Sequence, residues 1–252
     1  MSVFFLGAGP GDPELITVKG MKLLQEAPVI IYAGSLVNKE ILAYASPNAK
    51  IYDSASMTLE EVISVVKDAV GRNQWVVRLH TGDPALFGAI QEQMTLLDEE
   101  NISYEIVPGV SSFLAAAAAV KCELTIPEVS QTVIITRLEG RTPVPESQRL
   151  KKLTEHQASL CIFLSVHMID QVVQELLTGY SLNTPIAVVE KASWPGEEKV
   201  IKGTLATISD QVKEAGVLKT AMILVGNCLK LRDYRSQLYH PNFKHGYRDA
   251  SR

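Results

Sequence analysis

The first half of the chain alternates short apolar runs with longer amphipathic stretches. Runs rich in β-branched and aromatic residues predict strands at residues 3–6, 29–32, 50–52, 75–79 and 104–107. Helical periodicity predicts helices at about residues 17–26, 36–45, 59–71 and 86–99, and the run 113–120, which has no polar face, predicts a buried helix. Strands and helices that alternate in this way predict βαβ units and a parallel sheet.

The second half predicts another sheet, with some antiparallel pairing. Strands are predicted at residues 132–136, 160–164, 186–189, 199–203 and 222–225, and helices at about 147–156, 168–178 and 205–215. The short, turn-rich segment around Trp194, Pro195 and Gly196 predicts a hairpin between the third and fourth of these strands. A hairpin makes the second sheet mixed.

A domain boundary is predicted where the Ala-rich run gives way to Pro127 and a new strand, within residues 121–128. The fold class is therefore α/β with two α/β domains. Residues 1–121 form the first, with a parallel sheet, and residues 122–252 the second, with a mixed sheet and a tail rich in Lys and Arg. A ligand cleft is expected between them.

Composition and charge exclude several classes of protein. With 46% hydrophobic and 21% charged residues, the chain is typical of a compact globular protein, and a net charge of −4 argues against a nucleic-acid partner. The longest apolar stretch, between Glu105 and Lys121, is too short and too polar to cross a membrane. The N-terminus lacks the basic region of a secretory signal. Three cysteines without C-x-x-C spacing predict free thiols in a reducing cytoplasm.

The first loop with the features of a binding site is GAGPGDP at residues 7–13, directly after the first predicted strand. Glycines at the carboxyl end of a strand allow a ligand to approach the backbone closely. The dinucleotide pattern G-x-G-x-x-G fails here, because Asp12 stands at its last glycine and Pro10 and Pro13 obstruct an immediate helix start. Taken alone, the loop also fits a tight turn capped by Asp12.

Two further loops follow later strands of the same sheet. RLHTGDP at residues 78–84 offers Gly82 and Asp83, although Asp83 also fits a helix N-cap for residues 85–98. PGVSS at residues 108–112 offers two hydroxyls, and Ser111 equally fits an N-cap. Because the carboxyl ends of parallel strands meet at one sheet edge, the three loops are expected to converge on one small-molecule pocket.

Several chemistries lack their motifs. The sequence contains no G-x-x-x-x-G-K-[ST], no H-E-x-x-H and no G-x-S-x-G. The five histidines show no convincing metal-ligand spacing, so no metal is predicted, and only His80 lies on a loop expected at the site.

Taken together, these motifs resemble those of the tetrapyrrole methylases, S-adenosyl-L-methionine (AdoMet) enzymes of sirohaem and cobalamin biosynthesis. The resemblance rests first on VFFLGAGPGDP at residues 3–13, followed by Leu15, Thr17 and Gly20, and on RLHTGDP at 78–84. A finer resemblance, to the branch that methylates carbon 11 of precorrin-4, rests on segments 32–37, 80–84, 108–113, 124–132 and 236–248. Thr81 stands where other branches usually have Gly.

The resemblance implies two-domain subunits in a cytoplasmic homodimer, AdoMet bound in the cleft and released as S-adenosyl-L-homocysteine (AdoHcy), and a tetrapyrrole substrate with no nucleic-acid or membrane partner. The implied cofactor contacts are Pro10, Thr81, Gly82, Asp83, Leu86, Ser111, Ser112, Leu164, Ala192 and Ala221. Leu164 and Ala192 depart from the residues common in relatives, Met and Gly. We expect Asp83 to orient the cofactor. The resemblance also implies a polycarboxylate substrate, and the candidates for binding its acid groups are Arg78, His80 and the basic tail, with a helix-end or surface role as the alternative for each.

The chemistry needs neither a metal nor a covalent nucleophile, because a sulfonium methyl is already an activated electrophile. The sequence assigns no catalytic side chain and does not tell whether the substrate carries cobalt. Alternatives are a relative that methylates another ring carbon, diphthine precursors or ribosomal RNA, and a non-catalytic module that binds AdoMet or senses nucleotides. The absence of a basic face and the segment 32–37 weigh against the diphthine and RNA readings.

Overall fold

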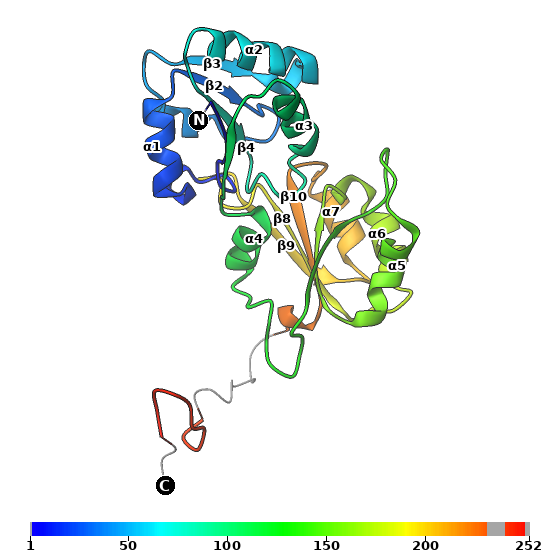
Figure 1. Cartoon of the computed structure of the whole chain (residues 1–252). Coiled ribbons are helices and arrows are strands. Elements are labelled where there is room, and N and C mark those ends of the chain that lie inside the picture. The colour runs from blue at the N-terminus through cyan, green and yellow to red at the C-terminus, as the bar shows by residue number, and fades with distance from the viewer. Residues whose placement is uncertain (1, 231–239, 250–252) are drawn as a thin grey trace. The chain divides into compact units, whose positions relative to one another are not determined.

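The structure, a computed structural model, describes residues 2–230 and 240–249 (Figure 1). It divides into two compact units, one made of Met1–Ala115 with Lys191–Glu198 and the other of Ala116–Glu190 with Lys199–Arg252. The domain boundary expected after residue 121 stays a prediction. Residues 236–239, part of the tail quoted for the resemblance, lie outside the described residues.

The first unit contains a five-stranded parallel sheet in the order β3-β2-β4-β1-β5, which confirms the predicted parallel sheet. Its strands are β1 (Val3–Gly7), β2 (Val29–Tyr32), β3 (Lys50–Asp53), β4 (Val76–His80) and β5 (Tyr104–Val107). The helices of this part of the chain are α1 (Val18–Glu26), α2 (Leu59–Gly71), α3 (Gln91–Glu99) and α4 (Ser112–Val120), together with a 3₁₀ helix at Lys39–Tyr44.

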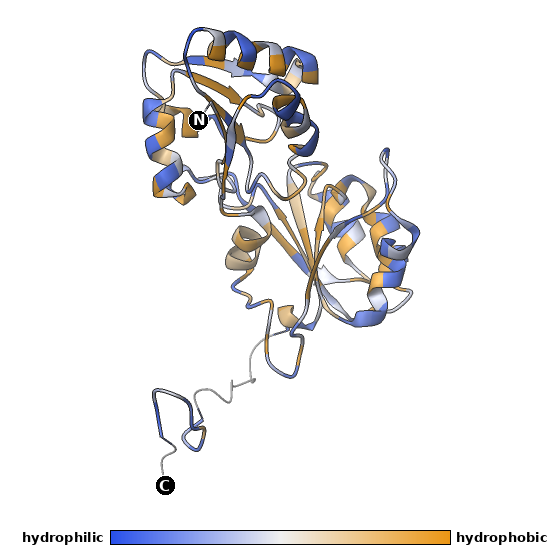
Figure 2. Ribbon diagram, in the orientation of Figure 1, coloured by the Kyte–Doolittle hydropathy of each residue, from blue (hydrophilic) through white to orange (hydrophobic). Residues whose placement is uncertain are grey.

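Each face of this sheet carries its own apolar core, visible as the orange interior in Figure 2. Phe5 and Ile31 pack on one face with residues of α2 and α3, and Leu6 and Ile30 pack on the other with residues of α1. Adjacent strand residues thus point to opposite faces, as the period of two requires. Cores on both faces are typical of a parallel sheet.

The second unit contains a five-stranded mixed sheet in the order β6-β7-β10-β8-β9. Its strands are β6 (Val133–Arg137), β7 (Ser159–Phe163), β8 (Pro185–Glu190), β9 (Lys199–Thr204) and β10 (Ala221–Val225), and its helices include α5 (Leu150–Leu153), α6 (Ile169–Leu176) and α7 (Ile208–Glu214). β6 and β7 are parallel, and the other pairs are antiparallel. The predicted hairpin, β8 with β9, and the predicted mixed sheet are confirmed.

Three predicted helices were wrong in extent or type. The helix expected at 86–99 begins only at Gln91, because Phe87 and Ala89 adopt left-handed backbone with φ of 55° and 49°, which a right-handed helix cannot contain. Residues 36–45 hold a 3₁₀ helix, and residues 147–156 divide into two 3₁₀ turns around the single α-helical turn of α5. By contrast, α2 begins where predicted, because Thr58 and Glu61 form a capping box.

Two neighbouring leucines at the end of α6, in the second unit, should differ sharply in how much they contribute to stability. Leu176 is fully buried, whereas Leu177 is 38% exposed. Leu176→Ala should lower the free energy of unfolding by about 2–5 kcal/mol through lost burial and a new cavity, and Leu177→Ala by less than about 1 kcal/mol. Denaturant unfolding of both variants measures the difference; equal losses would contradict the packing of α6.

Candidate functional site

Two loops pair through their backbones at the carboxyl edge of the first sheet. They follow β1 and β4, which are neighbours in the sheet. The Gly82 N–H donates to the Gly9 carbonyl at 2.8 Å, and the Gly9 N–H donates to the Gly82 carbonyl at 3.3 Å. Both glycines have positive φ, of 79° and 60°, a conformation that costs Gly little.

The loop after β5 lies against the same backbone. A Cβ built on Gly7 would lie 2.6 Å from both the Gly109 Cα and the Gly82 carbonyl oxygen, and a Cβ on Gly109 would lie 2.2 Å from that oxygen. A side chain at either position would force the backbones apart. The three loops therefore lie together, as predicted, and glycine is required where they touch.

Asp83 fastens two of the loops to each other. Its Oδ2 accepts a hydrogen bond from the Gly109 N–H at 2.9 Å, and its Oδ1 accepts one from the Ala85 N–H at 2.8 Å. A charged acceptor makes such bonds stronger than neutral ones. The alternative role as N-cap of a helix at 85–98 was wrong, because α3 begins at Gln91 with Ile90 at its N-cap.

The segment Lys191–Glu198 covers the first loop within the same unit. The Trp194 indole Nε1 donates to the Pro10 carbonyl at 3.2 Å, and the Asp12 N–H donates to the Ser193 hydroxyl at 3.1 Å. A Cβ on Gly11 would lie 2.0 Å from the indole ring, so glycine is needed here too. From the sequence, Trp194 was predicted only as part of a turn. A large aromatic residue in a short polar turn was the signal that could have indicated a further role.

The other expected cofactor contacts of this unit surround the three loops. Thr81 and Leu86 are half-buried, and the Leu86 N–H donates to the Asp83 carbonyl at 3.2 Å. Ser111 is buried and precedes the first residue of α4, Ser112; a Cβ on Gly82 would lie 3.6 Å from the Ser111 Cα and from the Ser112 nitrogen.

Three expected contacts lie on later segments of the chain. Ala192 is buried in the segment that covers the first loop. Leu164 and Ala221 belong to the second unit, and the structure places them only within it. Leu164 follows β7 with its side chain exposed, and Ala221 is the first residue of β10, paired with Glu190.

Arg78 and His80 lie inside the first unit, so the alternative of a helix-end or surface role was wrong. Both are buried, on the face of β4 that packs against α3. The Arg78 Nε donates to the Gln93 Oε1 at 3.1 Å, and its Nη1 donates to the Ile31 carbonyl at 3.3 Å. Burial lowers the pKa of Arg78 to about 10. The guanidinium is committed to these internal acceptors.

His80 is neutral at ordinary pH. Burial, reinforced by the nearby charge of Arg78, lowers its pKa to about 3. Its ring lies 6.0 Å from that of Phe5, and its Nε2 is buried without a hydrogen-bond partner among the described residues. A neutral imidazole in this position cannot act as a cationic anchor for an acid group.

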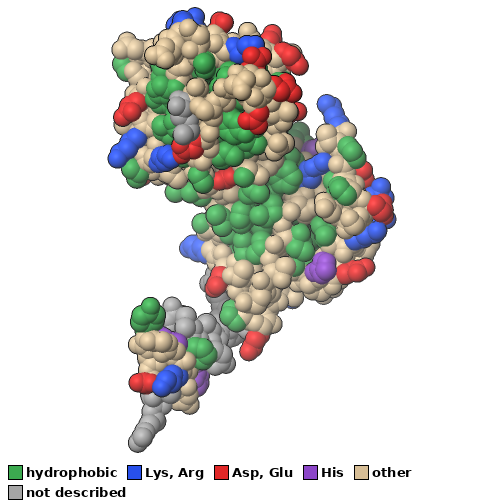
Figure 3. Space-filling model, viewed as in Figure 1, with side chains coloured by type: hydrophobic (Ala, Val, Ile, Leu, Met, Phe, Trp, Pro, Cys, Tyr) green, Lys and Arg blue, Asp and Glu red, His purple; other side chains and the backbone are tan. Residues whose placement is uncertain are grey.

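Residues 2–230 and 240–249 hold neither a candidate metal site nor a candidate membrane span. No three of their His, Cys, Asp and Glu side chains are grouped so that they could hold a metal ion. None of their helices is both long and apolar enough to span a bilayer. On the face of each unit shown in Figure 3, the Lys and Arg side chains are scattered among acidic ones rather than gathered in a basic patch.

His80 predicts a measurable pH dependence of stability. In the unfolded chain a histidine has a pKa near 6.5, so below this pH the unfolded state takes up a proton that folded His80 refuses. Stability from this residue is fully present above about pH 6.5 and is lost as the pH falls toward 3. Between pH 7 and pH 5 the wild type should lose about 2 kcal/mol more unfolding free energy than His80→Gln. Parallel pH profiles in urea unfolding would refute the assignment.

Known proteins match this chain over nearly its whole length. The family model for Tetrapyrrole (Corrin/Porphyrin) Methylases matches residues 2–209. A cobalt-precorrin-4 C(11)-methyltransferase of Methanocaldococcus jannaschii is 56% identical over 250 residues, covering 98% of this chain and 96% of that protein.

Solved structures agree with the sequence relatives. The X-ray structure of a cobalt precorrin-4 methyltransferase superposes with a TM-score of 0.88 at 49% identity, covering 90% of this chain and 95% of that one. A uroporphyrin-III C-methyl transferase from Thermus thermophilus, complexed with S-adenosyl homocysteine, gives a TM-score of 0.75 at 30% identity, covering 91% and 94%. The chain belongs to the tetrapyrrole (corrin/porphyrin) methylase family.

Proposed function

We propose that this protein is an AdoMet-dependent C-methyltransferase of cobalamin biosynthesis that methylates carbon 11 of precorrin-4 or cobalt-precorrin-4. The observation that carries the proposal is the junction of three glycine-built loops at the carboxyl edge of the parallel sheet, in a chain 56% identical to a relative named for this reaction. Open α/β sheets bind ligands at this edge.

The residues at the junction fit the proposed cofactor. Because Gly7 and Gly109 have no side chains, the backbones of the three loops lie against one another at this edge. Main-chain N–H and C=O groups of such loops suit the amino-acid and ribose parts of AdoMet. A uroporphyrin-III methyltransferase with the same fold was solved with AdoHcy. The residues proposed to hold AdoMet are Pro10, Thr81, Gly82, Asp83, Leu86, Ser111, Ser112 and Ala192 in the first unit, with Leu164 and Ala221 in the second.

The protein's part in the reaction is chiefly to position the reactants. When bound, AdoMet supplies an activated methyl group, so the chain needs no nucleophile of its own. Asp83 holds the second and third loops in register through the Gly109 and Ala85 N–H groups, and Trp194 holds the first loop at Pro10. Fixing these loops fixes the donors and acceptors that orient the ligand, which is how enzymes gain from proximity.

Two finer statements also belong to this proposal. By analogy with the family, the enzyme works as a homodimer, and it acts in the cytoplasm. The three cysteines, which are all free thiols in the structure, accord with a reducing compartment. Sedimentation of the purified protein tests the first statement, and fractionation of cells tests the second.

The reaction itself is tested with labelled AdoMet. The purified protein is incubated with it and with enzymatically generated corrin-pathway intermediates, label is followed into the tetrapyrrole fraction, and carbon NMR locates the new methyl group. We expect label at carbon 11 of a precorrin-4 skeleton. Label at another ring carbon would overturn the assignment within the family, and binding of AdoMet without transfer to intact substrate would point to a non-catalytic module.

Asp83→Ala should weaken AdoHcy binding at least about tenfold. Removing the carboxylate leaves two backbone N–H groups without their acceptor and frees the third loop from the second. Isothermal titration calorimetry with AdoHcy measures the change. Asp68→Ala, at an exposed position of α2, is the matched control and should bind as the wild type does. Equal affinity for both variants would remove Asp83 from the site.

A further inference from the structure

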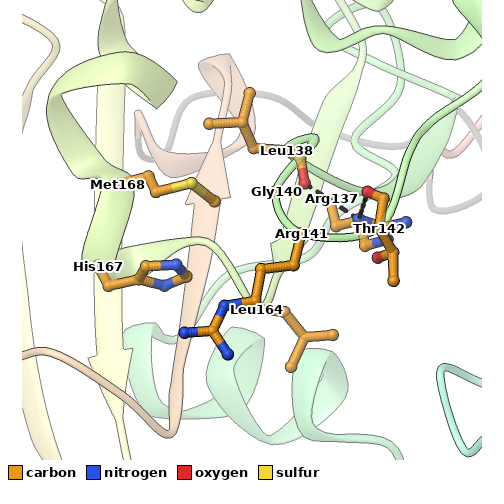
Figure 4. Close-up of a pocket in the computed structure, with 8 residues that line it drawn as sticks. All are labelled: Arg137, Leu138, Gly140, Arg141, Thr142, Leu164, His167 and Met168. Carbon is orange, nitrogen blue, oxygen red and sulfur yellow. Dashed lines mark hydrogen bonds between the residues drawn. The ribbon is translucent and has the colours of Figure 1, made fainter.

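A cavity of about 360 Å³ lies within the second unit, where the loops after β6 and β7 face each other (Figure 4). β6 and β7 are parallel, so these loops leave the same edge of the sheet. The lining combines apolar side chains with basic ones: Leu138, Leu164 and Met168 on one hand, and Arg137, Arg141 and His167 on the other.

A buried serine joins the two loops. The Ser165 hydroxyl donates to the Phe163 carbonyl at 2.6 Å and accepts from the Leu138 N–H at 2.9 Å. Ser165 is fully buried, so both bonds are shielded from water. This link fixes the distance between the loops and gives the cavity a defined width.

Arg137 holds the loop after β6 in shape. Its Nη1 donates to the Thr142 carbonyl at 3.1 Å and to the Leu138 carbonyl at 3.4 Å (Figure 4). Its Nη2 donates to the Pro143 carbonyl at 2.9 Å. These bonds close the loop on both sides of Arg141. The Arg137 guanidinium is thus occupied within the loop, and its bonds fix the backbone position from which the Arg141 side chain extends.

Arg141 and His167 supply the donors that the loop contacts do not use. In Figure 4 the Arg141 side chain passes Leu164 and directs its guanidinium toward the side of the cavity where His167 lies. Within residues 2–230 and 240–249, neither side chain is paired with a carboxylate. Among the residues that the structure describes, no acidic one lines the cavity; the nearby Glu139 is engaged by Arg149 and by the Val144 N–H.

Leu164 gives this cavity an exposed apolar wall. Its φ is 54°, in the left-handed region that a leucine rarely adopts, and its side chain is 54% exposed. Strained backbone of this kind persists where the surrounding structure enforces it, often at ligand sites. An apolar wall beside two strong donors suits a ligand that carries an anionic group on a carbon framework.

We propose that this cavity binds a carboxylate side arm of the tetrapyrrole substrate, with Arg141 as the ion-pair partner and His167 as a second hydrogen-bond donor. The proposal rests on the proposed function, which makes the substrate a ring with several carboxylates on short alkyl arms. AdoMet also carries a carboxylate, but its ammonium and sulfonium charges would lie near the Arg141 cation. A guanidinium recognises a carboxylate through two parallel N–H bonds.

The test measures tetrapyrrole and cofactor binding separately in the full-length protein. Arg141→Gln should raise the KM for the tetrapyrrole about tenfold or more and change kcat little, because the lost contact holds substrate and transition state alike. Arg141→Lys should have a KM between those of the wild type and Arg141→Gln, since lysine keeps the positive charge but cannot donate two parallel N–H bonds. His167→Phe should weaken tetrapyrrole binding by a smaller factor. Arg72→Gln, at an exposed position in the first unit, is the matched control.

Equilibrium binding decides the proposal independently of turnover. Absorbance titration of the tetrapyrrole against protein saturated with AdoHcy gives the substrate Kd, and calorimetry gives the Kd for AdoHcy alone. A weaker substrate complex with an unchanged AdoHcy Kd supports the proposal. A substrate Kd equal to that of Arg72→Gln, or an equal loss of AdoHcy affinity, overturns it. Wild-type protein that binds the tetrapyrrole but transfers no methyl group would contradict the proposed function instead.

Discussion

The first unit depends on the close approach of three stretches of backbone. Gly7 and Gly109 lie so close to each other and to the Gly82 carbonyl that neither has room for a Cβ, and Asp83 bonds to the loop that carries Gly109. The surface that results is built from main-chain groups, so its shape depends on the path of the chain more than on the side chains around it.

Local patterns were enough to predict much of this fold. All ten predicted strands exist, because alternation and apolar runs reflect contacts that every strand in a sheet makes. The helix expected at 86–99 was wrong in extent because Phe87 and Ala89 adopt left-handed backbone, which neither residue type favours and which the local pattern therefore does not indicate. The contact of Trp194 with Pro10 joins residues 184 positions apart, and no local pattern records it.

Arg78 and His80 show that a binding-loop motif can mislead about where its first side chains point. Both stand in the segment RLHTGDP, whose last residues form the junction of loops, yet they belong to β4 itself. Residues two apart in a strand share a face, so both side chains join Val76 in facing the interior. The two-residue period of the strand could have shown that these two side chains face the core, whereas the loop begins only at Thr81. The sequence could not show that Gln93 and the Ile31 carbonyl would satisfy the arginine.

The assignment of Lys191–Glu198 to the first unit has a consequence for how the chain is made. The first loop leaves the ribosome within the first dozen residues, but Ser193 and Trp194, which bond to it, follow some 180 residues later. During synthesis the glycine-rich loop stays without this cover until three of the second unit's five strands, β6, β7 and β8, have been made. A chain cut after residue 115 or 121 would lack this cover. The two units are therefore separate in packing but not in sequence, and the proposed cofactor-binding edge is completed only late in translation.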